Sequence, residues 1–500
     1  MHALVARSAL VIGLAALGAC PVAAQSLAAF PGAEGFGAQS TGGRGGRVIY
    51  VTSLGADGNT PGTLNWALRQ TGPRYILFKV SGVIHAPAHI RQAHVTIAGQ
   101  TSPGGVIVRG MVCDGHYLRH DCSNLIVRHM RSRPAAHRGV PSGGDALDDA
   151  LRLDGIKRFI IDRSSFAHAA DEAVQLSWAS EGTIQRSIIA ETVGGHAIYG
   201  GLLMNYAHPD FPQDQLSLVK NLWYRLGGRL PEINCEGSNY EDIQPFRIDA
   251  CQNTPLRVEL SNNLQFDPGI DVQFAQWVDA NPANGPYLIR MNAVGNYVIG
   301  RSGYGNAVFN WDMLRNAGNR LHLADNRMNL YPGYTDYQLS YCCNDFPSAA
   351  PNTWLGLAER MSQRHPYPPI QYLPASTLPA AMPGLAGAFP HDPMDRRIMA
   401  RVQSRVPALL DRAQPEAEDA LLLDFSSAPP PPPDRDNDGM PDAFEVRHAA
   451  LGLNPDVAQT NGAQLSLPLL GVAGYDNLEV YLHLLSEALA RGEVFADGYE

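Results

Sequence analysis

A series of short apolar runs, recurring from about Tyr50 to Tyr331, constrains the fold more than any other feature of this sequence. Each run ends near Gly, Asn, Asp or Ser, and few helical stretches lie between the runs. Strands this short and numerous do not suit a doubly wound sheet. They suit a solenoid, in which each coil buries its face against the next, and irregular coil lengths leave a β-sandwich as the alternative. The runs include 48–51, 75–78, 95–97, 106–108, 125–127, 159–161, 216–219, 258–260 and 288–290, and several have an asparagine nearby, as at Asn124, Asn221, Asn262 and Asn296.

The composition indicates a folded, acidic protein. Hydrophobic residues make up 45% of the chain and charged residues 17%, as in well-packed domains. The formal net charge of −10 argues against nucleic acid or an anionic membrane as the main partner. An acidic polymer bound by this chain would need a local basic cleft or bridging cations.

The first residues have the pattern of an export signal. Arg7 supplies a positive charge, residues 9–19 are apolar, and Ala24 ends a small-residue cleavage site before Gln25. The apolar run is too short to span a bilayer. We therefore predict cleavage after Ala24 and a secreted or periplasmic protein, with a lipid anchor on Cys20, in a lipobox-like segment, as the alternative.

Six cysteines follow the signal, and an even number in an exported chain suggests disulfides. The pairs Cys113–Cys122 and Cys235–Cys251 would each close a short loop. The adjacent Cys342 and Cys343 are harder to place, because bridging neighbours strains the geometry. None of the six has a metal-ligand spacing, so we predict structural roles.

The composition divides the chain into five parts. They are a signal peptide at 1–24, the solenoid at 25–345, a wrapping segment rich in Pro and Ala at 346–428, a stiff proline linker at 429–433 and a separate C-terminal unit at 434–500. A helix is expected at about 393–414 in the wrapping segment, and an apolar-periodic helix is expected to end near Ala490.

The C-terminal unit opens with the twelve-position spacing of an EF-hand calcium loop. Side-chain oxygens fall at positions 1, 3, 5, 9 and 12, position 7 offers a carbonyl, and Gly439 stands at the sharp turn. No helix precedes the loop, because the proline run does, so it resembles dockerin loops more than a signalling sensor. We predict a structural Ca²⁺ site with the ligands Asp434, Asp436, Asp438, Met440, Asp442 and Glu445.

Several segments, in order, resemble bacterial pectate lyases of polysaccharide lyase family one. They are AFPGAEGFG at 29–37, VIYVTS at 48–53, PGTLNWAL at 61–68 and VTIAGQTSPG at 95–104. The resemblance runs from residue 29 to about 300, and the C-terminal calcium loop is a common companion of the family. It implies a right-handed parallel β-helix that holds Ca²⁺ in a groove against an acidic galacturonan chain. We expect a monomer.

The reaction that this resemblance implies is β-elimination. An arginine removes the proton α to the uronate carboxylate, and the C4–O bond then breaks. Calcium would neutralise that carboxylate by direct coordination. Arginine is normally a poor base, because its pKa is above ~12, and a cation-rich site would make its neutral form accessible.

The resemblance assigns the base to Arg229, in the Arg-Leu-Pro turn at 229–231, behind a strand that ends near Asn221. A surface arginine on a β-turn is the alternative. The family's second arginine, which commonly follows the proline and grips the substrate, is missing here, because Glu232, Ile233 and Asn234 occupy that stretch.

Two further residues are expected to bind the substrate. His196 aligns with the family's substrate-binding lysine, and Lys220 stands, with Val219, where the family usually has paired histidines. A buried structural role is the alternative for His196.

For the groove calcium, the resemblance implies the ligands Asp149 and Asp171, with Asp148 and Glu172 as near neighbours. Gln175 stands in place of one classical carboxylate, which predicts weaker calcium binding by the free enzyme. The alternative is that the acidic residues between 145 and 154 form a solvated turn.

Two other functions stay open. Clustered aspartates would also suit a polygalacturonase-like glycoside hydrolase on the same solenoid, although the Asn-Thr-Asp and Arg-Ile-Lys segments expected of such enzymes are not present. A non-catalytic carbohydrate-binding protein would keep the fold without turnover.

Overall fold

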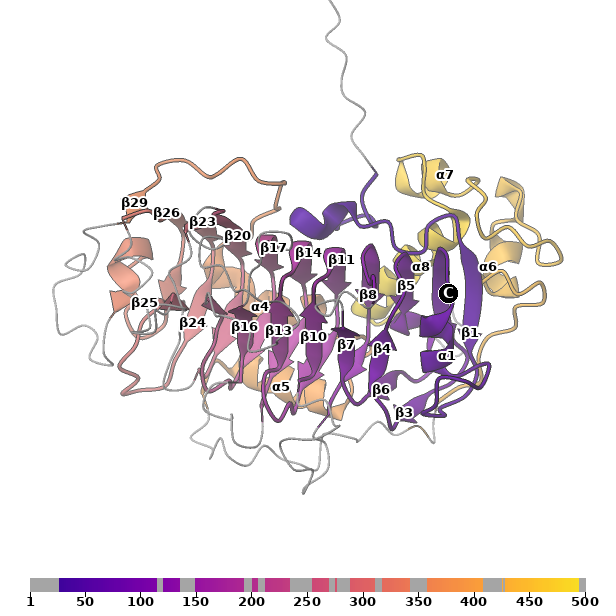
Figure 1. Ribbon diagram of the computed structural model, residues 1–500, viewed down its shortest axis with the longest axis horizontal. Coiled ribbons are helices and arrows are strands. Elements are labelled where there is room, and N and C mark those ends of the chain that lie inside the picture. The colour runs from indigo at the N-terminus through magenta and orange to yellow at the C-terminus, as the bar shows by residue number, and fades with distance from the viewer. Residues whose placement is uncertain are drawn as a thin grey trace, which may run out of the picture.

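The computed structural model describes residues 27–114, 120–134, 149–192, 200–205, 212–233, 254–268, 275–276, 288–310, 317–341, 358–407, 425 and 428–493. Their strands stack into three long sheets along one axis (Figure 1). We name the sheets A, B and C in the order in which each coil of the chain passes through them. Neighbouring strands are parallel and come from successive coils. The predicted right-handed parallel β-helix is therefore confirmed, and the β-sandwich is excluded.

The strands coincide with the short apolar runs of the sequence. Sheet A contains β1 (Arg47–Val51), β2 (Arg74–Phe78), β5 (Val95–Ala98), β8 (Leu125–Arg128), β11 (Lys157–Asp162), β14 (Ser180–Gln185), β17 (Asp214–Val219), β20 (Leu256–Ser261), β23 (Ile289–Val294), β26 (Arg320–Ala324) and β29 (Glu359–Arg360). Sheet B contains β3 (Gly82–Ile84), β6 (Val106–Val108), β9 (Arg131–Ser132), β12 (Ser165–Ala167), β15 (Ile188–Ala190), β18 (Leu222–Tyr224), β21 (Leu264–Phe266), β24 (Tyr297–Ile299) and β27 (Arg327–Met328). Sheet C contains β4 (Ala88–Ile90), β7 (Met111–Asp114), β10 (Leu151–Asp154), β13 (Val174–Ser177), β16 (Leu202–Asn205), β19 (Glu232–Ile233) and β22 (Ala275–Gln276), and β25 (Phe309–Asn310) pairs separately with β28 (Ser340–Tyr341).

The interior is built from like residues in register. In sheet A, one row of aliphatic side chains runs through β2, β5, β8, β11 and β14, and each member is fully buried. Branched side chains pack well on a pleated surface, so each coil completes the core of its neighbour. This row contains Ile76, Ile97, Val127, Ile161 and Ile184.

Asparagines form a ladder at the turn from sheet A to sheet B. The Nδ2 of Asn221 donates to Asn263 Oδ1 at 3.2 Å, and Asn263 and Asn296 continue the ladder to Asn326. Each amide also donates to a backbone carbonyl of the preceding coil, such as Ile184 O at 2.9 Å. The amides thus satisfy buried turn groups that the sheets leave unpaired. Asn124 and Asn262, by contrast, occupy left-handed backbone positions with φ of 56°.

Added segments cover the outer faces of sheets A and B. The N-terminal segment, with η1 (Phe36–Gln39), packs Phe30 against Ile126 and Ile160 of sheet A. In the predicted wrapping segment, α4 (Leu378–Leu385) and α5 (Pro393–Ser404) pack on sheet B. The helix predicted from Pro393 begins there and ends at Ser404, where Arg405 turns into the left-handed region. Other helices among the described residues of this part are α1 (Leu64–Arg69), η2 (Gly99–Thr101), η6 (Asp336–Leu339) and η7 (Ala375–Thr377).

The C-terminal unit packs against the first coils. It contains α6 (Asp442–Arg447), η9 (Ala449–Leu451), α7 (Ser466–Leu470) and α8 (Asn477–Arg491), drawn in yellow beside β1 and β5 in Figure 1. The predicted C-terminal helix is confirmed as α8. Its apolar side shares one buried cluster with Tyr75, Leu77 and Ala98 of sheet A, so this unit is continuous in packing with the solenoid.

The last strand of sheet A is short and charged. It consists of Glu359 and Arg360, both exposed. Glu359 also pairs with Arg320 of β26 at 2.6 Å.

One predicted disulfide is present, between Cys113 and Cys122. The signal peptide with Cys20 lies outside the described residues, as do Cys235, Cys251, Cys342 and Cys343. Among the residues that the structure describes, no helix has both the length and the apolar character needed to cross a bilayer.

We predict that the fold loses stability in acid through two buried carboxylates. Burial alone would raise their pKa values, but Arg128, Arg186 and Arg163 hold the pKa of Asp162 well below its usual range. Contacts from His168 and Arg397 lower the pKa of Glu191 to about 2. Because both folded pKa values are depressed, their contribution is complete above the unfolded value of about 4 and is lost as pH falls below it.

The test is the thermal midpoint measured by circular dichroism across that pH range. The midpoint should fall steeply below pH of about 4, and Asp162→Asn should flatten part of that fall. A midpoint that stays constant to pH of about 2 would contradict the assignment.

Candidate active site

The candidate site lies at the edge where the chain enters sheet C. Asp149 precedes β10, Asp171 and Glu172 precede β13, and Arg229 precedes β19. The register pairs Leu151 with Val174, so Asp149 and Glu172 take equivalent places in neighbouring coils. Residues that are far apart in the sequence therefore form one row.

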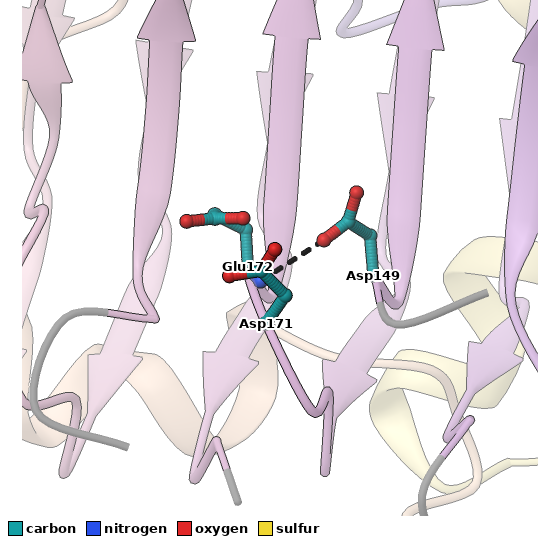
Figure 2. A group of neighbouring side chains, drawn as sticks. All are labelled: Asp149, Asp171 and Glu172. Atoms are coloured by element: carbon teal, nitrogen blue, oxygen red, sulfur yellow. Dashed lines mark hydrogen bonds between the residues drawn. The ribbon is translucent and has the colours of Figure 1, made fainter. Parts of the chain in front are cut away.

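Three carboxylates form a compact group in this row (Figure 2). Asp149, Asp171 and Glu172 each offer an oxygen, and these oxygens lie within 4.8 Å of one another. The backbone N–H of Glu172 donates to Asp149 Oδ1 at 3.0 Å, which fixes one carboxylate. Asp149 and Glu172 are only 3% and 2% exposed. Converging carboxylate oxygens suit a hard cation such as Ca²⁺, and a cation would relieve the repulsion between them, so this donor set fits calcium.

Arg229 joins this group through Glu172. Its Nη1 pairs with Glu172 Oε1, and its Nε pairs with Glu232 Oε2 at 3.2 Å. Glu172 and Arg229 stand two coils apart, and the coil between them has Gly200 and Gly201 at this edge. Strands are spaced about 4.8 Å apart, so two long side chains can meet only across a place that carries no side chain.

The backbone around Arg229 is closely packed against that glycine pair. Arg229 has φ of 56°, in the left-handed region, and its carbonyl accepts a hydrogen bond from Leu202 N at 2.5 Å. A Cβ on Gly201 would lie 2.1 Å from the Arg229 carbonyl oxygen and 2.3 Å from that of Gly228. Gly201 is thus required for the turn that presents Arg229.

Two neighbouring side chains line the outer face of sheet C. Gln175, which replaces a family carboxylate, donates to Ser177 Oγ at 3.0 Å and stands beside Arg152 in register. Arg152 pairs with Asp154 at 2.6 Å and lies 3.9 Å from Asp149. Arg152 is therefore a cation at the margin of the carboxylate group.

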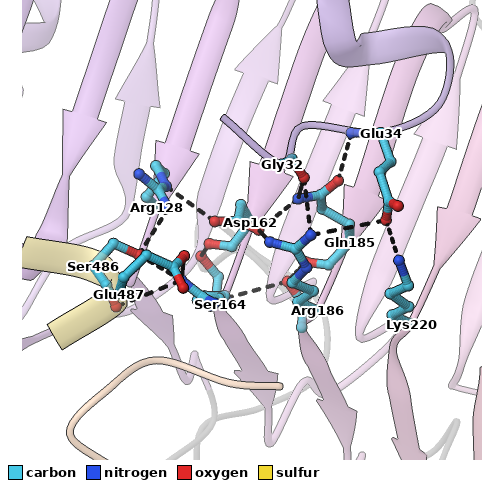
Figure 3. A network of polar contacts seen from close by, with 12 residues as sticks. Gly32, Glu34, Arg128, Asp162, Ser164, Gln185, Arg186, Lys220, Ser486 and Glu487 are labelled. Atoms are coloured by element: carbon cyan, nitrogen blue, oxygen red, sulfur yellow. Dashed lines mark hydrogen bonds and ion pairs between the residues drawn. The ribbon is translucent and has the colours of Figure 1, made fainter. Parts of the chain in front are cut away.

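Lys220 lies elsewhere. It follows β17, at the end of β18 opposite to Arg229, and its Nζ pairs with Glu34 Oε2 of the N-terminal segment at 2.5 Å (Figure 3). Burial lowers its pKa, against the opposing effect of Glu34. The structure thus brings together Asp149, Asp171, Glu172 and Arg229, but not Lys220, while His196 and Asp148 lie outside the described residues.

Sequence reasoning missed two contributors. Glu232 departs from the family pattern, yet it holds the Arg229 guanidinium. The importance of Gly200 and Gly201 depends on register, although the paired glycines were visible in the sequence.

The C-terminal loop forms a second carboxylate group. Oxygens of Asp434, Asp436 and Asp438 lie within 4.8 Å of one another, and Gly439 has φ of 101° at the turn. Burial and the neighbouring carboxylates raise the pKa of Glu445 to about 8 and that of Asp434 to about 7. Asp442 instead pairs with Arg435 at 2.9 Å, and Met440 lies buried at the seventh position.

Comparisons with known proteins agree on one family. "Probable pectate lyase C" of Aspergillus oryzae is 30% identical over 467 residues, which cover 92% of this chain and 94% of the relative. The protein of the same name from Aspergillus fumigatus (strain CBS 144.89 / FGSC A1163 / CEA10) is 29% identical over 94% of this chain and 97% of its own length. No family model matches the chain.

Solved structures give weaker likenesses. The chain matches pectate lyase Bsp165PelA from Bacillus sp. N165 in complex with trigalacturonate, at 14% identity and a TM-score of 0.44, over 71% of this chain and 99% of that one. It also matches jun a 1, the major allergen from cedar pollen, at 14% identity and a TM-score of 0.40, over 71% and 92%. The parallel pairing of strands from successive coils by itself defines the fold.

Both of these relatives are fungal, so the expected likeness to bacterial members in particular finds no support. The 30% identity to the Aspergillus oryzae protein, over 92% of this chain, identifies the family. The chain belongs to the pectate lyase family.

Proposed function

We propose that this chain is an exported polysaccharide lyase that cleaves galacturonan by β-elimination, with Arg229 as the base and Ca²⁺ in the groove. The observation that carries the proposal is the shared carboxylate of Glu172. Glu172 belongs to the group of three carboxylates and also pairs with Arg229. It therefore places the candidate base directly beside the candidate metal ligands.

The fixed carboxylates explain why a cation is needed. Galacturonan is a polyanion, and Asp149, Asp171 and Glu172 alone would repel its carboxylates. Calcium held by these three residues would neutralise the substrate carboxylate and so acidify the proton α to it. The net charge of −10 fits binding through a bridging cation.

The chain's own residues then orient the base. Glu172 and Glu232 contact the guanidinium from two sides, and the left-handed turn fixes its backbone. In its neutral form, Arg229 takes the proton from the carbon α to the carboxylate, the freed electron pair forms a double bond to C4, and the C4–O bond breaks. The leaving oxygen takes a proton from solvent, which leaves an unsaturated uronate.

The carboxylate spacing argues against an inverting hydrolase. Inverting glycosidases separate their two carboxyl groups by about 6.5–9.5 Å to admit a water molecule. Here the oxygens of Asp149, Asp171 and Glu172 lie within 4.8 Å of one another.

We also infer export through the N-terminal signal, and the fungal relatives give the alternative lipid anchor on Cys20 no support.

Polygalacturonate with Ca²⁺ should yield an unsaturated uronate, seen as rising ultraviolet absorbance, and a chelator should abolish the rise because the carboxylate group would lose its cation. Reducing ends that form without ultraviolet absorbance would indicate hydrolysis. Activity that persists in the chelator would also contradict the proposal.

Arg229→Ala should lower kcat by about 10²–10⁴-fold, because a positioned proton acceptor is lost, while polygalacturonate binding measured by calorimetry should persist. The matched control is Arg327→Ala, which removes an exposed arginine that pairs with Asp325 at 2.7 Å. Rates equal to wild type in Arg229→Ala would assign the base elsewhere.

Gly201→Ala should lower kcat by on the order of 100-fold, because the new methyl displaces the Arg229 turn and small misplacements have large effects. Gly333→Ala, whose Cβ would meet no atom within 4 Å, should leave kcat unchanged. Circular dichroism checks that both variants fold. A folded Gly201→Ala enzyme with normal kcat would show that this packing is unimportant.

A further inference from the structure

The C-terminal loop has buried carboxylate oxygens that point to a bound cation. Glu445 is fully buried, and neither of its oxygens has a hydrogen-bond partner within the described residues. The oxygens Asp434 Oδ1 and Asp436 Oδ2 are also buried and have no hydrogen-bond partner within that part of the chain. Buried carboxylate oxygens are normally paired or bound to a metal, because burying them bare is costly.

This loop lies against the first coil of the β-helix. The hydroxyl of Tyr50, on β1, donates to the Asp434 carboxylate. Lys79, just after β2, donates to Asn437 Oδ1 at 3.3 Å. A Cβ on Gly439 would lie 3.0 Å from Leu77 of β2 and 2.8 Å from Leu478 of α8, so the loop backbone is pressed between sheet A and the helix.

The loop is also tied to the start of α8. Asp438 Oδ2 accepts from Gln459 N at 2.7 Å, and the Asp438 carbonyl accepts from Thr460 Oγ1 at 2.8 Å. Gln459 in turn accepts through its carbonyl from Asn477 Nδ2 at 3.1 Å, at the first residue of α8. A cation that fixes Asp438 would therefore fix the entry to this helix.

The other end of α8 is anchored farther along sheet A. Ser486 Oγ lies 2.7 Å from Arg128 Nη2 (Figure 3). It also lies 2.7 Å from His129 Nε2 and 2.8 Å from Arg163 Nη1. Glu487 pairs with Arg163 at 2.6 Å. The helix thus spans from the loop near β1 and β2 to the coils of β8 and β11.

We propose that a calcium ion bound by Asp434, Asp436, Asp438, the Met440 carbonyl and Glu445 locks α8 and the rest of the C-terminal unit onto the first coils of the β-helix. This site is separate from the groove, so the inference is independent of the proposed lyase function. Ion binding and docking are coupled, and each strengthens the other by the same factor. The ion acts as a clamp on the N-terminal end of the solenoid.

Terbium, which replaces calcium at oxygen sites, provides a local probe in the full-length protein. Because the Tyr50 hydroxyl touches Asp434, a bound terbium ion should give tyrosine-sensitised emission. Asp436→Asn/Glu445→Gln should lose this emission and one equivalent of calcium by calorimetry. Asp149→Asn/Asp171→Asn, which alters the groove, should keep this emission and the loop's equivalent of calcium, and lose only calcium bound in the groove. If terbium emission and calcium stoichiometry were unchanged in the loop variant, Asp436→Asn/Glu445→Gln, the proposed site would be overturned.

Hydrogen exchange tests the clamp itself. Calcium should slow amide exchange in α8 and β2 by about tenfold or more in the wild type and in the groove variant, and not in the loop variant. Equal exchange with and without calcium in the wild type would overturn the clamp even if the site binds the ion.

An interface variant tests the coupling from the opposite side. Ser486→Ala removes the contacts to Arg128, His129 and Arg163 without touching the loop, and it should weaken calcium binding at the loop several-fold. The matched control is Ser404→Ala, at an exposed serine that donates only within its own helix end, to Arg401 O at 2.7 Å. Unchanged loop affinity in Ser486→Ala would contradict the coupling.

Discussion

The hydrogen-bonded register between successive parallel coils determines the rest of this structure. It places Asp149 beside Glu172, although Val174, the partner of Leu151, lies 23 positions later in the sequence. It also places Gly200 and Gly201 in the coil between Glu172 and Arg229, which lets those two side chains meet. The active site is therefore an arrangement of equivalent positions in neighbouring coils, and a shift of one residue in any of them would disperse it.

The sequence predicted the features that depend on residues close to one another in the chain. The apolar runs predicted the strands, the spacing of two cysteines predicted one disulfide, and Pro393 predicted the start of α5. The register between coils could not be predicted in this way. Asn262 and Asn263 are neighbours of the same type, but only Asn263 joins the amide ladder, because the two side chains face different surroundings.

Long-range contacts explain the other places where the structure differs from what the sequence predicted. Lys220 is close to Arg229 in the sequence, but β18 runs between them and carries them to opposite ends. The C-terminal unit looked separate because a proline run precedes it, whereas Arg44 and Glu479, 435 positions apart, pair at 2.9 Å. Several other arginines also form internal contacts between segments that are far apart in the sequence. Arg128, Arg131 and Arg133 are almost completely buried and bind covering segments, so they add no basic surface for an acidic polymer.

The charged strand that ends sheet A has a consequence for solubility. A solenoid has two open ends, and an unpaired parallel strand can in principle accept a strand from a second molecule. β29 offers only Glu359 and Arg360, both exposed, and Glu359 is already paired with Arg320. Such a short, charged edge gives an incoming strand few hydrogen bonds and displaces a salt bridge, so it disfavours end-to-end growth into fibres.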